Sequence, residues 1–91
     1  MEISKMLTVS TAHITKTTAE LLDDGVRDLI VYPKAEHGWF ILIPSSDVID
    51  SLHIVMSDLM RLLKLAKDLG CEWLCLDCDG EVLDYMTTYE W

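Results

Sequence analysis

An apolar stripe with helical spacing runs between residues 46 and 69 and is the longest periodic pattern in the chain. Its members recur at alternating intervals of four and three residues: Val48, Leu52, Val55, Leu59, Leu62, Ala66 and Leu69, with Ile49, Met56 and Leu63 widening the stripe. The stripe predicts one long amphipathic helix, capped by Pro44-Ser45-Ser46-Asp47 and stopped by Gly70. The pattern also allows a kink at Leu52–Ile54. A stripe this wide is typical of a helix that covers a sheet, and less typical of a coiled-coil dimer.

Strand signals precede this helix. Residues Met6 to Ile14 are rich in β-branched side chains and predict a first strand that ends near His13. Thr17 to Glu20 match the capping-box spacing and predict a short helix that ends at Gly25.

A hairpin is predicted next. Leu29–Tyr32 and Trp39–Ile43 are nearly continuous runs of strand-forming residues, and Ala35–Gly38 supply the loop between them. Runs this apolar predict strands that are buried on both faces or nearly so. Pro33 cannot donate to a β-ladder, which places it at a strand end or on an edge strand.

A second hairpin is predicted after the long helix. Asp79-Gly80 separates the runs Cys71–Cys78 and Glu81–Met86, and Asp-Gly favours a tight turn with positive φ. The resulting order is β-α-β-β-α-β-β. The sequence therefore predicts a single α+β domain over residues 1–91, with an antiparallel or mixed sheet and one long and one short helix packed on one face.

Composition limits the classes of partner. The chain has 91 residues, 51% of them hydrophobic, and a net charge of −9, so it is predicted to fold and to avoid direct contact with nucleic acid or anionic lipid. With neither an apolar span nor a secretory signal in the sequence, a cytoplasmic location is expected. The three cysteines are expected to be reduced thiols.

Acidic and aromatic residues are concentrated at the C-terminal end. The last 24 residues contain seven Asp or Glu, two Trp and two Tyr, and no Lys or Arg. Aromatic side chains are enriched at protein interfaces, and negative charge attracts basic proteins. The candidate partner-binding residues are Glu72, Trp73, Asp77, Asp79, Glu81, Asp84, Tyr89 and Trp91.

No metal, cofactor or redox site is predicted. Cys75 and Cys78 form a C-x-x-C sequence, but in a strand they point to opposite faces, and no second ligand pair accompanies them. A redox C-x-x-C would open a helix, whereas here the helix precedes it. Asp77 and Asp79 offer too few oxygens for calcium or magnesium.

His13 is the centre of a candidate ligand site. Thr11 and Thr15 flank it at a strand-to-helix junction, where a hydroxyl beside an imidazole can support acid-base or nucleophilic chemistry. The alternative is structural, because Thr15 or Thr17 is a suitable helix cap. No nucleophile elbow, phosphate loop, dinucleotide fingerprint or zinc-protease motif is present, so an enzymatic role has no positive support.

Several segments together resemble a family of small bacterial proteins of unknown function carried on plasmids, integrative elements and prophages. These segments are Ser10–Thr15, Gly38-Trp39-Phe40, the run from Gly70 to Gly80 and the closing Tyr89-Glu90-Trp91. The resemblance covers nearly the whole chain. It implies an accessory gene that acts against host defence or regulates the element, and it brings no catalytic residues with it.

Three hypotheses follow. The first is a non-enzymatic acidic module that binds a basic or nucleic-acid-handling protein and inhibits it, by steric block or by mimicry of DNA charge. The second is a small enzyme or ligand-binding domain that uses His13 with an acid such as Glu72 or Asp77. The third is a structural subunit whose exposed aromatic side chains are buried in a homodimer.

Overall fold

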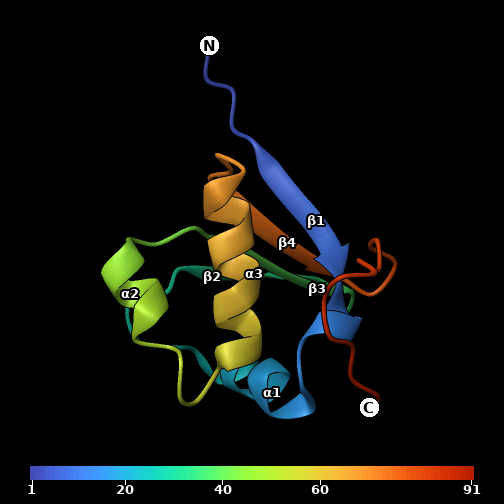
Figure 1. Ribbon diagram of the computed structural model, residues 1–91. Coiled ribbons are helices and arrows are strands. Elements are labelled where there is room, and N and C mark those ends of the chain that lie inside the picture. The colour runs from blue at the N-terminus through green and yellow to red at the C-terminus, as the bar shows by residue number, and fades with distance from the viewer.

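The computed structural model describes residues 1–91 and consists of a four-stranded mixed sheet with helices packed against it (Figure 1). The elements are β1 (Met6–Ser10), the short 3-10 helix η1 (Thr11–His13), α1 (Lys16–Asp24), β2 (Val31–Lys34), β3 (Gly38–Leu42), α2 (Ser46–Asp50), α3 (Ser57–Asp68) and β4 (Trp73–Asp77). The predicted α+β class is confirmed. None of the helices combines the length and the apolar content needed to cross a membrane.

The last strand in the sequence lies inside the sheet. The strand order is β1-β4-β3-β2, in which β4 pairs parallel with β1 and antiparallel with β3, while β2 pairs antiparallel with β3. Both edges of β4 are therefore hydrogen-bonded. As expected for a central strand, β4 has a continuous apolar sequence, and Leu74, Cys75 and Leu76 are all buried.

The core lies between one face of the sheet and the helices. Alternate residues of the strands point into it, including Val9 of β1, Ile41 of β3 and Leu74 of β4. α3 lies across this face in Figure 1, and Leu59, Leu62 and Leu63 of its apolar stripe are fully buried. The stripe thus covers a sheet, as predicted.

The prediction of one helix from Ser46 to Leu69 is wrong. Residues 51–55 form turns between α2 and α3, and the side chain of Val55, a member of the predicted stripe, is exposed. Ser51 Oγ donates to the carbonyl of Val48, and the ring of His53 bonds the carbonyl of Asp50. These local bonds satisfy the final carbonyls of α2 and compete with helix propagation.

The second hairpin is also wrong. A tight turn does form, but over residues 77–80, with Gly80 N donating to Asp77 O at 2.8 Å. Its central residues are Cys78 and Asp79 rather than Asp79 and Gly80, the expected positive φ is absent at Asp79 and Gly80, and residues 81–86 are not a strand. They cannot pair with β4 because β1 and β3 already occupy both of its edges. The chain instead crosses the end of β1, where Ser10 N donates to Glu81 O at 2.8 Å.

Smaller differences concern the ends of elements. β1 ends at Ser10, before the predicted His13, because the chain turns into η1. Thr15 rather than Thr17 caps α1, its Oγ1 accepting from Thr18 N at 3.1 Å.

The first hairpin forms, but β2 begins at Val31 and lies at the edge of the sheet, as Pro33 indicated. The expected burial of β2 on both faces is wrong, since Tyr32 is 55% exposed.

Asp58, at the start of α3, joins that helix to α1. Its carboxylate is buried and accepts from Thr15 N at 2.7 Å and from Thr18 Oγ1 at 2.8 Å. Asp58→Ala leaves the buried hydroxyl of Thr18 and the partly buried amide of Thr15 without their acceptor. It is expected to reduce the free energy of unfolding by about 2–3 kcal/mol, measured by urea denaturation.

Asp50→Ala is the matched control for Asp58→Ala. The Asp50 carboxylate makes an exposed ion pair with Lys64 at 3.3 Å, so its loss should cost less than about 1 kcal/mol. Equal effects of the two substitutions would contradict the structural role assigned to Asp58.

Candidate functional site

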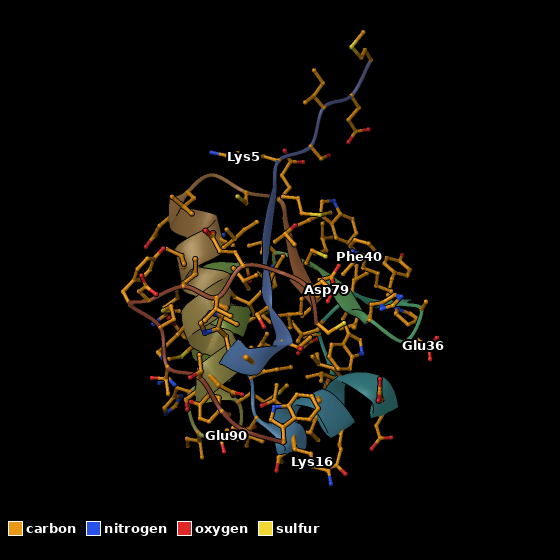
Figure 2. All side chains as sticks on the ribbon, turned by 90° about the vertical axis from the view of Figure 1, so that its right-hand side faces the viewer. Lys5, Lys16, Glu36, Phe40, Asp79 and Glu90 are labelled. Carbon is orange, nitrogen blue, oxygen red and sulfur yellow. The ribbon has the colours of Figure 1, made fainter.

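The helices leave the opposite face of the sheet uncovered. In Figure 2 Phe40 projects away from α3, on the far side of the strands. The strand register aligns three rows of side chains across this face: Met6, Trp73 and Leu42; Thr8, Cys75, Phe40 and Tyr32; and Ser10, Asp77, Gly38 and Lys34. Each row contains residues from at least three strands, so the face exists only once the sheet is assembled.

The middle of this face is apolar. Met6, Tyr32, Phe40 and Trp73 line a shallow hollow of about 270 Å³ with no polar residue among them. The rings of Tyr32 and Trp73 lie with centroids 6.1 Å apart and tilted by 40°, within the range of favourable aromatic pairs. We call these four residues the aromatic patch. An exposed apolar cluster of this kind is typical of a protein-binding surface.

An ion pair closes one end of the uncovered face. The Lys34 ammonium bonds the Asp77 carboxylate and also lies 5.7 Å from the centroid of the Phe40 ring. This bond, helped by the backbone N–H of Asp79, holds the pKa of Asp77 below its ordinary value, and the same bond raises the pKa of Lys34. Between them and the patch, burial raises the pKa of the Cys75 thiol, so Cys75 stays protonated and packs as an apolar side chain.

The predicted partner-binding residues are divided between separate regions. Trp73 and Asp77 lie on the uncovered face, Glu72 just precedes β4, and Asp79 lies in the turn that follows it. The rest belong to the C-terminal segment, residues 81–91, which leaves the sheet; these are Glu81, Asp84, Tyr89 and Trp91.

Two of the predicted aromatic residues attach the C-terminal segment to the domain. Trp91 Nε1 donates to Ile14 O at 2.8 Å, and Tyr89 N donates to Ala12 O at 2.8 Å. The Tyr89 hydroxyl accepts from Arg61 at 3.1 Å. Both residues therefore have a structural explanation, although the Trp91 side chain remains more than half exposed.

His13 holds the same segment from inside. Its ring is 2% exposed, and Leu83 N donates to Nε2 at 2.8 Å while Nδ1 lies 2.9 Å from Thr87 O. Nε2 must accept and Nδ1 must donate, which fixes one neutral tautomer and leaves neither nitrogen free for a ligand. Of the neighbouring hydroxyls, Thr15 caps α1 and Thr11 lies in η1.

Sequence reasoning found Trp73 but missed Met6, Tyr32 and Phe40. Alternation within the strands could have indicated part of the patch, because Tyr32 and Phe40 alternate with Val31 and Ile41, which face the core. Which face the helices would cover depends on the assembled sheet. The run from Trp39 to Ile43 therefore predicts burial on both faces or nearly so.

The Lys34–Asp77 ion pair makes stability depend on pH. The contribution of Asp77 is present above its ordinary pKa of 3.8 and is lost as the pH falls through the lower pKa of the folded state. The stabilising contribution of Lys34 is present below its ordinary pKa of 10.5 and is lost as the pH rises through the raised pKa of the folded state. Asp77→Asn should therefore be less stable than wild type near pH 7, with a gap that narrows as the pH falls below 3.8, measured by urea denaturation.

Asp84→Asn is the control for this titration, because Asp84 is exposed and no side-chain bond to it occurs. The free energy of unfolding of Asp84→Asn should equal that of wild type at every pH. A gap between Asp77→Asn and wild type that stays constant in acid would show that the ion pair does not stabilise the fold.

Comparison with known proteins places the chain in a family. Neither a curated protein nor a solved structure matches it. The model of a family described as "Family of unknown function (DUF5983) C-terminal domain" matches residues 6–91, which include every strand and helix of the fold. The chain therefore belongs to the DUF5983 family of unknown function.

Proposed function

We propose that this protein is a non-enzymatic binding module whose uncovered sheet face docks on a basic surface of a partner protein. The observation that carries the proposal is the aromatic patch of Met6, Tyr32, Phe40 and Trp73, which no helix covers. Large rings held by a rigid sheet lose little conformational entropy on binding and supply much apolar area, which makes them suitable interface anchors.

Charge favours a basic partner. Glu72 before β4, Asp79 after it and Glu36 in the β2–β3 loop are all exposed at the ends of the strands that form this face. Figure 2 shows Glu36 at the tip of its loop, on the same side of the sheet as Phe40. With the net charge of −9, these acids attract a cationic protein, repel a second copy of the chain and oppose contact with nucleic acid.

We further propose that the module inhibits its partner protein and does so in the bacterial cytoplasm. The segment from Gly70 to Gly80 resembles accessory proteins of plasmids, integrative elements and prophages, and such genes often act against host defence. A basic surface on a host protein is often its nucleic-acid site, so an acidic module docked there would block it or mimic DNA charge.

The test is affinity capture from bacterial lysate with wild type, Tyr32→Ala, Trp73→Ala and the control Tyr85→Ala, read by mass spectrometry. Tyr85 is 72% exposed but lies in the C-terminal segment, outside the aromatic patch. Wild type and Tyr85→Ala should capture the same basic protein, more strongly at about 0.1 M than at about 0.5 M salt. Each patch variant should weaken binding to the purified partner by about tenfold or more.

Other results would contradict the proposal in different ways. Capture that Tyr32→Ala and Trp73→Ala leave intact would place the interface elsewhere. Association of the pure protein into dimers, lost in Trp73→Ala, would assign the aromatic patch to a second copy of the chain. The absence of any captured protein at either salt concentration would remove the protein-binding role.

A further inference from the structure

We propose that His37, Cys78 and Asp79 form a binding site for zinc or a similar borderline divalent transition metal. The ligand atoms of these three exposed residues all lie within 4.8 Å of one another. The site is separate from the aromatic patch and shares only Asp79 with the acids invoked for docking.

The geometry agrees with tetrahedral zinc. Zn–S and Zn–N bonds of about 2.3 and 2.05 Å at a tetrahedral angle separate sulfur from nitrogen by about 3.6 Å. Cys78 Sγ lies 3.7 Å from His37 Nδ1. One edge of the coordination tetrahedron is therefore already formed, and a carboxylate oxygen of the exposed Asp79 lies within 4.8 Å of both atoms.

The backbone holds the two contributing turns together. Cys78 N donates to His37 O at 2.8 Å, and His37 N donates to Lys34 O at 2.9 Å within the β2–β3 turn. Asp79 N donates to the Asp77 carboxylate at 2.9 Å, which fixes the turn after β4. Sheet pairing thus brings together ligands that lie 41 residues apart in the sequence.

Close backbone approach reinforces this arrangement. Gly38 pairs with Asp77, and a Cβ at Gly38 would lie 1.7 Å from the carbonyl oxygen of Leu76. Only glycine therefore permits the β2–β3 turn to approach the end of β4 this closely. The contact positions His37 beside Cys78 in the protein before any metal binds.

The ligand types select the metal. A thiolate, an imidazole and a carboxylate suit Zn²⁺ and Co²⁺ and are poorly suited to Ca²⁺ or Mg²⁺, which need six or more oxygens. Three protein ligands leave the fourth tetrahedral position for water. His37 and Cys78 line a hollow of about 360 Å³, which has ample room for that water or a small ligand.

The other thiols cannot take part. Cys75 is 1% exposed on the sheet and Cys71 is buried near the start of β4, whereas Cys78 is exposed. Only Cys78 of the C-x-x-C sequence can therefore bind the metal. The nearby ammonium of Lys34 is bonded to Asp77, which offsets its repulsion of a bound cation.

Cobalt titration of the untagged, reduced protein tests the site, because a thiolate bound to Co²⁺ gives an intense charge-transfer absorption. Wild type should show this absorption at one equivalent of Co²⁺ and lose it when Zn²⁺ is added. Cys78→Ser should abolish it. His37→Ala and Asp79→Asn should weaken Co²⁺ binding by at least about tenfold, while the exposed control His53→Ala should bind as wild type does.

Thermal unfolding gives a second readout that does not depend on the absorption. Zn²⁺ should raise the Tm of wild type and of His53→Ala but not that of Cys78→Ser, whose substitution on the surface leaves the core intact. Absence of the absorption, or its persistence in Cys78→Ser, would overturn the proposal. The proposal would also be overturned if Cys78→Ser lost the absorption while His37→Ala and Asp79→Asn bound Co²⁺ as wild type does. The thiol alone would then bind the metal.

Discussion

The pairing of β4 on both edges determines the rest of the structure. With β1 on one side and β3 on the other, β4 becomes the centre of a sheet whose first and last strands in sequence are neighbours. Leu74 and Leu76 then anchor the core beneath α3. The pairing also leaves residues 81–86 without a strand to join, so they cross the end of β1.

The C-terminal segment is held by polar contacts more than by sheet pairing. His13 accepts from Leu83 N and bonds Thr87 O, and Trp91 and Tyr89 bond the backbone near η1. Because a buried imidazole with two protein partners is costly to displace, this histidine is better explained as part of the architecture than as a reactive group. The uncovered sheet face is then the surface with the strongest indication of binding.

Local patterns predicted much of the fold. The apolar stripe indicates a helix that covers a sheet, and Pro33 indicates a strand end or an edge strand; the structure has such a helix and places β2 at the edge. Asp79-Gly80 indicates a tight turn, which forms at residues 77–80 without the positive φ expected at Asp79 and Gly80. The pattern allows a kink at Leu52–Ile54, where the chain breaks between α2 and α3, but it does not predict the full break. Ser51 and His53 end α2 through side-chain bonds that periodicity does not register. The false second hairpin arose because a turn signal cannot show that both edges of the preceding strand are already paired.

Non-local pairing also explains which site residues the sequence revealed. The acidic and aromatic C-terminal composition identified Trp73 and Asp77, but Tyr32 and Phe40 join them only through the β2–β3–β4 register. His37 meets Cys78 through the same register. Neither the aromatic patch nor the three-residue metal cluster is contiguous in sequence, and neither has a spacing that a motif would record.

Amide hydrogen exchange followed by NMR tests the central position of β4 most directly. If β1 and β3 occupy both edges of β4, the amides of Leu74, Cys75 and Leu76 should be among the slowest to exchange. The amides of Val82, Asp84 and Tyr85, which donate to no protein acceptor, should exchange far faster. Equal protection of residues 73–77 and of Val82, Asp84 and Tyr85 would show that these segments form a hairpin. That result would contradict the sheet order, and with it the arrangement of the uncovered face and of the His37–Cys78 pair.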